Sequence, residues 1–474
     1  MRIAFLFILM LFLDGCSKKS SAPSLELGSL IENFPAAGGS KDITVTTSGS
    51  FAASDTSAWC LTTAGNGKFT VLVQPNITTA ERKTAITITA GSNRKEFMVV
   101  QAGAEPVDPN GGVVPDSIPP DASGMRDITP QTLAQEMVPG WNIGNSLDAT
   151  GGETAWGNPL ISQRLIDSVK KAGFKSIRLP VAWSKFSDAD AFTIDTNWMR
   201  RVEEVVNYAL RRDMYVLMNI HWDGGWMQPT NAKKDYVNNR LKIMWKQIAK
   251  RFRNYNDHLI FAGTNEVMAD GDYGTPTPEY YNAQNSFNQT FINAVRATGG
   301  RNAHRNLVVQ GFNTNIGHTI NFFQLPTDPR ANRIMVEVHY YDPFNFTLNE
   351  NSNITQWGKD ATDPAKTETW ANETWADDQF RQMKTKFIDK GIPVILGEYG
   401  AIARTSLGSP EANADHAKYR LYYLQYVTQS IKSHGLVPMY WDNGFPGDKS
   451  MALFNRNTGE KYYADIISVI TSNN

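Results

Sequence analysis

The feature that most constrains the fold is a unit repeated from residue 125 to the end, a short apolar run followed by a stretch with helical periodicity. A run of roughly four to eight apolar residues between turn residues is typical of a strand buried on both faces. Eight such strands alternating with helices predict an α/β fold, a (β/α)8 barrel. The runs are Trp141–Leu147, Ser176–Val181, Tyr215–His221, Leu259–Glu266, Asn306–Phe312, Arg333–Tyr340, Pro393–Glu398 and Leu436–Trp441.

A doubly wound open sheet is the competing architecture. It is disfavoured because the turn after the first run, in GWNIGNSLDA, lacks the GxGxxG phosphate-binding pattern. Helix boundaries are legible between the runs. Asn158 followed by Pro159 predicts an N-cap with proline at the first helical position, and Gly173 predicts the end of that helix. Gly299, Gly391 and Gly435 predict three further helix ends.

The preceding part of the chain has strand periodicity instead. Residues 25–103 contain four runs of alternating polarity, which predict a small all-β, immunoglobulin-like sandwich. Residues 104–123 contain five prolines and no periodic pattern, and predict a semi-rigid linker. The barrel is therefore expected over residues 124–474.

The N-terminus has the composition of an export signal. Met1-Arg2 and the apolar run Ile3–Leu13 precede LDGC, which is similar to a bacterial lipoprotein cleavage box. We expect a signal peptide over 1–15, a lipid on Cys16, a polar tether over 16–24, and an exported protein anchored in the outer membrane, on the cell surface or its periplasmic face. A plain cleaved signal, with Cys16 lost or unmodified, is the alternative.

Composition narrows the ligand class. The net charge of -1 and the absence of a basic stripe argue against nucleic acid. Twelve tryptophans are present, and all except Trp59 follow residue 140. Exposed tryptophan in a cleft suits flat, hydroxyl-rimmed ligands such as sugars. We expect a monomer with no cofactor and no metal.

The ends of the eight runs carry polar and aromatic side chains that a merely structural barrel does not need. In a barrel, the C-terminal tips of all strands face one shared mouth, where catalytic groups lie. The tip residues are Asn145 with Asp148, Arg178, His221, Asn265 with Glu266, Asn313, His339 with Tyr341, Glu398 and Trp441.

The residue types at these tips select one kind of chemistry. The HWD sequence at His221–Asp223 has no companion ligand motif for zinc, no GxSxG elbow is present, and no tip carries a lysine. Glu266 and Glu398 remain, and a carboxyl pair between aromatic walls suits glycoside hydrolysis.

The same motifs resemble a known family. GWNIGNSLDA, IRLPVAW, NIHWDGG, Asn265-Glu266, HYYDP, LGEYG and MYWDNG look like the successive strand motifs of glycoside hydrolase family 5, closest to its endo-β-1,4-glucanase and xyloglucanase branch. SAWC, the corner at 76–82 and the closing VVQAG resemble the BACON module of secreted carbohydrate-active proteins. In this module we expect Trp59 to be a core residue and the module to be a spacer.

The resemblance implies a role for each site residue. Glu266 would be the acid/base and Glu398 the nucleophile of a retaining mechanism, with carboxyls about 5–5.5 Å apart. Glu398 would stay ionised, and Glu266 would hold its proton with a raised pKa. The remaining residues would contact the substrate or these glutamates: Arg178 and Tyr341 beside Glu398, Asn265 on the sugar 2-OH, His221 and His339 at the cleaved bond, Trp441 as stacking floor, and Asn145 and Trp222 on the substrate.

The sequence departs from the family pattern at Ala262-Gly263 and Val267, which bear on substrate shape, and at Trp222, which changes one ligand contact. The expected activity is retaining hydrolysis of internal bonds in plant β-glucans, with xyloglucan favoured. Cellulose, mixed-linkage glucan, mannan and xylan are alternative substrates within the family. A non-catalytic, cell-surface glycan-binding protein is the alternative outside enzymes.

Overall fold

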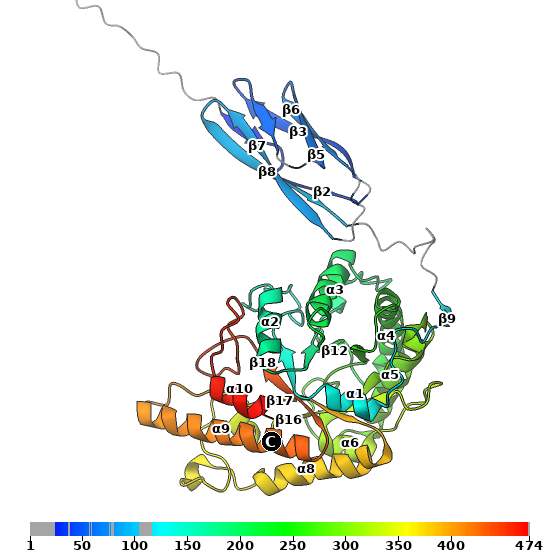
Figure 1. Ribbon diagram of the computed structural model, residues 1–474, viewed down its shortest axis with the longest axis vertical. Helices are drawn as coiled ribbons and strands as arrows, with labels where there is room; N and C mark the ends of the chain where they lie inside the picture. The colour runs from blue at the N-terminus through cyan, green and yellow to red at the C-terminus, as the bar shows by residue number, and fades with distance from the viewer. Residues whose placement is uncertain are drawn as a thin grey trace, which may run out of the picture. The chain divides into compact units, whose positions relative to one another are not determined.

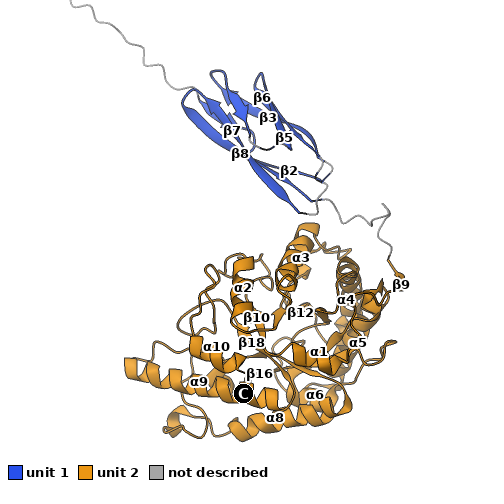
Figure 2. Cartoon of the chain, in the orientation of Figure 1, with its two compact units in different colours: residues 1–114 blue, residues 115–474 orange. Residues whose placement is uncertain are grey.

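The computed structural model describes residues 24–103, apart from 37, 56, 58, 75 and 77–79, and residues 116–472. The chain divides into two compact units, Met1–Val114 and Pro115–Asn474, each with its own hydrophobic core (Figure 2). The expected signal peptide and Cys16 lie outside the described residues. No helix in the described part of the chain combines the length and apolarity needed to span a membrane.

The first unit is a sandwich of two four-stranded sheets, as predicted. One sheet has the order β1-β3-β6-β5 and the other β2-β8-β7-β4. The strands are β1 Leu25–Leu27, β2 Ile31–Phe34, β3 Gly39–Thr47, β4 Ala52–Ser54, β5 Cys60–Gly65, β6 Lys68–Val73, β7 Arg82–Ala90 and β8 Asn93–Gln101. The four predicted strands are β3, β6, β7 and β8. The others were missed because β1, β2 and β4 are only three or four residues long and β5 buries little beyond its first residue.

The sandwich core is formed by side chains that alternate along both sheets. Phe69 and Phe97 meet edge to face with ring centroids 5.3 Å apart. Trp59 packs against this core, as predicted, and the guanidinium of Arg82 lies 4.3 Å from the centre of its ring. Trp59 is therefore a structural residue of the module.

The second unit is a closed barrel of eight parallel strands (Figure 1), and each of the eight predicted runs overlaps one of them. The strands are β10 Gly140–Ile143, β11 Ser176–Leu179, β12 Tyr215–Asn219, β13 Leu259–Ala262, β15 Leu307–Asn315, β16 Ile334–Tyr340, β17 Val394–Tyr399 and β18 Val437–Asp442.

Helices surround the strands in Figure 1 and cover their outward-facing side chains. The helices of this unit are α1 Pro130–Glu136, α2 Gln163–Lys171, α3 Thr196–Leu210, α4 Asn231–Arg251, α5 Pro278–Arg296, α6 Ile316–Phe322, α7 Phe344–Thr347, α8 Glu373–Lys386, α9 Pro410–Ser433 and α10 Ala464–Thr471. In α3, for example, Val202, Val205 and Val206 are buried at helical spacing.

The interior of the barrel is apolar at the end where the strands begin. Leu133 of α1 and the C-cap residue Met137 belong to a buried cluster that includes Leu217, Ile260 and Val308 from three strands. These residues alternate with the outward-facing ones, so they occupy the lumen. The buried charged side chains Arg178, Glu337 and Glu398 lie at the opposite end.

The predicted start of the first barrel helix is wrong. Helix α2 begins at Gln163, and Ser162 is its N-cap, accepting a hydrogen bond from the backbone N–H of Leu165 (3.3 Å). Asn158 is buried and its side-chain amide donates to the carbonyls of Asn145 (2.8 Å) and Asn443 (2.9 Å). Asn158 therefore joins the loops that follow the first and last strands of the barrel.

The barrel unit also begins earlier than residue 124. Strand β9, Ile118–Pro120, pairs with the short strand β14, Gly299–Gly300. The backbone N–H of Ile118 donates to Thr298 (3.3 Å) and that of Asp121 to Gly300 (3.1 Å). Gly299 has φ of +67°, and a Cβ at this position would lie 1.7 Å from the Ile118 carbonyl oxygen. The end of the predicted linker is thus part of the barrel unit.

Two truncations test this boundary. A chain that begins at residue 116 should unfold at the same midpoint temperature as the barrel of the whole chain, because each unit has its own core. A chain that begins at residue 124 loses two backbone hydrogen bonds worth about 1 kcal/mol each, so its midpoint should fall by roughly 2–4 °C. Calorimetry of both chains is the measurement. Equal midpoints for the two truncations would show that β9 does not stabilise the barrel.

Candidate active site

The centre of the polar end of the barrel is Arg178, on β11, which is completely buried. Its Nε donates to Glu337 Oε1 (2.7 Å), and its Nη1 donates to Glu398 Oε1 (2.8 Å) and to Asn142 Oδ1 (2.9 Å). Its Nη2 donates to Asn265 Oδ1 (2.6 Å). This one guanidinium on β11 therefore joins side chains from three other strands, β10, β16 and β17, and from the loop after β13.

Glu337 and Asn142 were not among the predicted site residues. Glu337 lies on β16 with no exposed surface, and its second oxygen accepts from Gln310 Nε2 (2.6 Å). Burial alone would raise the pKa of Glu337, but Arg178, His339 and Gln310 together lower it to about 2. The charge is visible in the sequence as one acidic residue inside the apolar run RIMVEVHY.

Glu398 lies near the end of β17 and is 6% exposed. Besides the bond from Arg178, its Oε2 accepts from the Tyr341 hydroxyl (3.2 Å). Burial raises the pKa of the Glu398 carboxyl, and the neighbouring carboxylates Glu266 and Glu337 add to this, against the opposing charges of His339 and Arg178. A carboxylate that is paired but still basic is suited to nucleophilic attack.

Glu266 follows β13 and faces the open mouth, with 42% of its side chain exposed. Its Oε1 lies 2.7 Å from Nδ1 of His339. Burial alone would raise the pKa of Glu266, but the hydrogen bond and the charge of His339 lower it. The raised pKa expected for Glu266 is therefore wrong for the protein without substrate, because the 2.7 Å contact between Glu266 and His339 was not foreseen.

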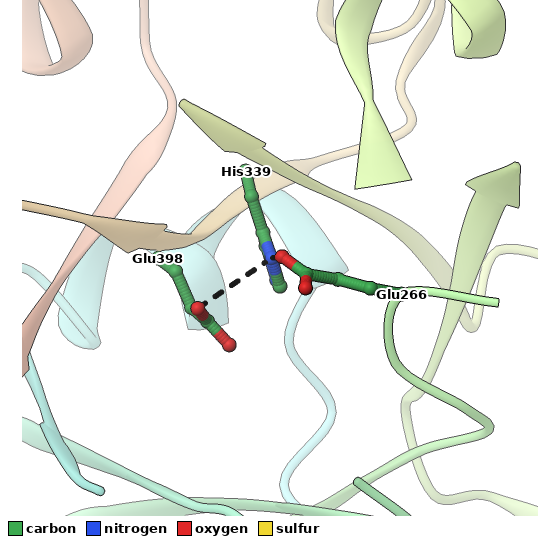
Figure 3. Close-up of side chains that lie close together, drawn as sticks. All are labelled: Glu266, His339 and Glu398. Atoms are coloured by element: carbon green, nitrogen blue, oxygen red, sulfur yellow. Dashed lines mark hydrogen bonds and ion pairs between the residues drawn. The ribbon is translucent and has the colours of Figure 1, made fainter. Parts of the chain in front are cut away.

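His339 lies between the two glutamates (Figure 3). Its Nδ1 is 2.7 Å from Glu266 and 3.8 Å from Glu398, and its Nε2 is 3.5 Å from Glu337. Burial lowers the pKa of His339, but these three carboxylates outweigh it, Glu398 most of all, and raise the pKa to about 9. The Glu266–His339 pair therefore holds a proton at neutral pH.

The two glutamates are close enough for direct attack on a sugar. One carboxylate oxygen of Glu266, one of Glu398 and a ring nitrogen of His339 all lie within 4.8 Å of one another. Retaining glycosidases place their carboxyls about 5–5.5 Å apart, and inverting enzymes about 6.5–9.5 Å. The same three groups could in principle surround a metal ion, but the buried cation Arg178, 2.8 Å from Glu398, disfavours a second positive charge there.

The predicted aromatic wall of the site consists of two stacked rings. His221 and Trp441 lie 5.7 Å apart with planes inclined by 9°. Burial and the charge of Arg178 hold the pKa of His221 well below its usual range, so the ring is neutral. Gly144 leaves room for the tryptophan, because a Cβ there would lie 2.5 Å from its ring.

The remaining predicted site residues lie around this centre. Trp222 is 54% exposed and lines a hollow together with Asn265 and Glu266. Asn145 lies in the loop after β10 with φ of +55°, and its carbonyl accepts the bond from Asn158. The structure thus places Arg178, Asn265, Glu266, His339, Tyr341 and Glu398 in one network, His221 with Trp441 beside it, and Trp222 and Asn145 at its edge.

The long segment after β16 presents aromatic rings to solvent. Trp370 and Trp375 are 48% and 37% exposed and meet edge to face at 5.5 Å. Trp375 Nε1 donates to Asp342 (2.9 Å), which ties the segment to the residue after Tyr341. Trp357, in contrast, is buried and packs the segment down.

Comparisons with known proteins agree with this geometry. The family model described as Cellulase (glycosyl hydrolase family 5) matches residues 142–447. A second family model, BACON, matches residues 46–102 and is described as a putative binding domain, N-terminal. A xyloglucan-specific endo-β-1,4-glucanase of Bacteroides ovatus is 38% identical and aligns over 99% of this chain and 96% of its own length.

Solved structures are similar over most of the chain. A Bacteroides ovatus family 5 xyloglucanase in complex with a XXXG heptasaccharide has a TM-score of 0.72 and 38% identity, covering 94% of this chain and 99% of that chain. A broad-specificity endoglucanase from Bacteroides salanitronis has a TM-score of 0.67 and 39% identity, covering 73% of this chain and 96% of that chain.

The roles of the two glutamates can be separated by substitution. Glu398→Gln should keep the fold but lose turnover by at least about 10³-fold, because a neutral amide cannot form a glycosyl ester. Glu266→Ala should lose much less on an aryl β-glycoside whose leaving group needs no proton. With added azide, Glu266→Ala should give the β-glycosyl azide and Glu398→Ala the α-anomer. The products are identified by NMR, and reversed anomers would exchange the two assignments.

Proposed function

Since the chain belongs to glycoside hydrolase family 5, we propose that it is a retaining endo-β-1,4-glucanase that cleaves internal bonds of plant β-glucans, with xyloglucan as its main substrate. The observation that carries the reaction type is the spacing of Glu266 and Glu398, with their nearest oxygens and His339 within 4.8 Å. Two carboxyls at this spacing leave no room for a water molecule between Glu398 and the bound sugar, so Glu398 attacks the sugar directly.

The first step forms a covalent intermediate. An oxygen of Glu398 attacks the anomeric carbon while the bond to the leaving sugar breaks, and the proton of the Glu266–His339 pair passes to the departing oxygen. Arg178 Nη1 (2.8 Å) and the Tyr341 hydroxyl (3.2 Å) hold the two oxygens of Glu398 in place for this attack. Positioning of this kind, already present before substrate binds, accounts for much of the rate that an active site provides.

The second step reverses the roles. Glu266, now a carboxylate, removes a proton from water, and the resulting hydroxyl attacks the anomeric carbon and releases Glu398. Two displacements at one carbon restore the original configuration, which is the definition of retention. Because 42% of the Glu266 side chain is exposed, water can reach the Glu266 carboxylate.

The preference for xyloglucan rests on the relatives together with the shape of the mouth. The relative that aligns over 99% of this chain is a xyloglucan-specific enzyme. The exposed rings of Trp222, Trp370 and Trp375 provide stacking surfaces for a polymer at an open mouth. A broad-specificity endoglucanase of the same fold supports cellulose or mixed-linkage glucan as a second candidate.

A non-catalytic glycan-binding role is disfavoured by the charges of the site. Binding alone needs no buried arginine shared between two carboxylates, and burying such charges costs several kcal/mol unless every one is paired. Mannan and xylan are further substrates of the family, and they are separated from glucans by direct assay.

A panel of polymers tests the substrate assignment. Reducing-sugar release from xyloglucan should exceed that from barley β-glucan and carboxymethyl cellulose by about tenfold or more in kcat/KM, and glucomannan and xylan should be cleaved least. Viscosity should fall early in the reaction, since internal bonds are cut. A higher kcat/KM on unbranched glucan than on xyloglucan would show that the main substrate is an unbranched glucan. Cleavage of mannan or xylan alone would show that the enzyme is not a glucanase.

We also propose that the protein is exported and attached to the outer membrane through a lipid on Cys16, followed by a tether over residues 17–24. Cys16→Ser should move the expressed protein from the membrane fraction to the soluble fraction and abolish labelling by a fatty-acid analogue. Cys60→Ser is the matched control, because Cys60 is buried in the sandwich core. Labelling that persists in Cys16→Ser would contradict the proposal.

A further inference from the structure

We propose that Glu337 is a positioning residue for the proposed hydrolysis: it holds Arg178 in the orientation that serves both catalytic glutamates, and its fixed negative charge sets the pH range in which the enzyme works. This inference rests on the proposed function, and it adds a residue outside the catalytic pair. Glu337 does not reach the open mouth, since it has no exposed surface.

The first step of the argument is geometrical. A guanidinium is planar, and its five N–H groups point in fixed directions. Once Nε is held by Glu337 at 2.7 Å, the rotation of the plane is fixed. Nη1 then points at Glu398 (2.8 Å) and Nη2 at Asn265 (2.6 Å), the residue before Glu266. Without Glu337, Arg178 could turn to make a two-pronged pair with Glu398 and leave Asn265.

The second step is that residues of the two neighbouring strands fix the position of the Glu337 carboxylate. Its Oε2 accepts from Gln310 Nε2 (2.6 Å) on the neighbouring strand β15. On the other side, Gly397 leaves the space that the carboxylate fills, because a Cβ at this position would lie 2.0 Å from Glu337 Oε1. Glycine directly before the nucleophile Glu398 is thus explained by Glu337. The carboxylate is held on both sides and has one available position.

The third step concerns charge. The charged or titratable groups that face this carboxylate or its partner Arg178 are Arg178 from β11, His339 from β16, Glu398 from β17, Glu266 after β13, Tyr341 after β16 and His221 after β12. Gln310 and Asn142 are neutral. A permanent negative charge at Glu337 makes it harder to ionise the nearby carboxyls Glu398 and Glu266 and easier to protonate His339.

Removal of this charge should move both sides of the pH profile in one direction. The acidic limb of kcat/KM reports the ionisation of Glu398, whose pKa the charge of Glu337 raises. The alkaline limb reports the proton on the Glu266–His339 pair, and Glu337 raises the pKa of both members. Without the charge of Glu337 all of these pKa values fall, so the bell-shaped pH profile of kcat/KM shifts as a whole to lower pH.

Two variants separate charge from position. In Glu337→Gln, both limbs of the kcat/KM profile on soluble xyloglucan should shift to lower pH by at least about 0.5 unit, with kcat/KM at the optimum lowered roughly 10- to 100-fold. Glu337→Asp keeps the charge but withdraws it by one methylene. It should keep the limbs close to wild type while kcat/KM falls about tenfold or more.

A matched control excludes a general effect of losing a buried ion pair. Asp328 pairs with Arg296 at 2.7 Å, nearly buried, in the segment that precedes β16 at the opposite end of the barrel. Asp328→Asn should lower the unfolding temperature but leave the pH profile in place. Thermal unfolding of every variant shows which ones are folded.

The outcomes are distinct. A folded Glu337→Gln variant with limbs unmoved, or moved to higher pH, overturns the role of the charge. If Glu337→Gln does not fold, the decision falls to Glu337→Asp, and a wild-type kcat/KM in that variant overturns the positioning of Arg178. Failure of the wild-type enzyme to cleave any glucan would refute the proposed function, whereas an active wild type with unshifted variants refutes only the role of Glu337.

Discussion

The structure of the active end of the barrel depends on the complete pairing of one buried cation. Arg178 has no exposed surface, and an unpaired guanidinium in such a place would cost several kcal/mol. Its partners Glu337, Glu398, Asn142 and Asn265 come from different parts of the barrel wall. Each of these strands must therefore be in register for the charge to be satisfied, so correct closure of the barrel and assembly of the site are one requirement. Loss of one partner from a buried pair costs about 3–5 kcal/mol.

This requirement also explains how the lumen is divided. The end closed by α1 is filled by apolar side chains such as Leu217, Ile260 and Val308. These supply stability without any need for paired charges, so the polar layer above them can be arranged for chemistry. A barrel with buried charges at both ends of its lumen would have to pair every one of them. A barrel without any buried charge would lack the groups of an active site. The apolar layer thus provides stability, and the polar layer above it holds the paired charges of the site.

Much of this arrangement follows from the sequence, because strands of a barrel have a short period and a common direction. All eight strands and every tip residue in the network were predicted from apolar runs and the residues that end them. Glu337 was missed because the prediction looked only at strand ends, although Glu337 lies two residues before His339 and so faces the same side. Asn158 was misassigned because its local pattern is that of a helix cap, whereas its partners Asn145 and Asn443 are far away in sequence. The lowered pKa of Glu266 could not be foreseen for the same reason, since it depends on a 2.7 Å contact with His339 from another strand.

The charges around His339 finally connect the resting protein with the reaction. Three carboxyls, Glu266, Glu337 and Glu398, face two cations, Arg178 and the protonated His339. The largest influence that raises the pKa of His339 is the charge of Glu398. In the proposed mechanism, the ester between Glu398 and the sugar removes that charge, so the pKa of the Glu266–His339 pair falls at the moment when its proton has to leave with the departing oxygen. Glu266 is then a carboxylate facing solvent, which is the state needed to activate water. When hydrolysis restores the charge on Glu398, the pKa of the pair rises again, and the pair keeps the proton that Glu266 has taken from water. The contacts that hold the resting site together therefore also govern the proton transfer in both proposed steps.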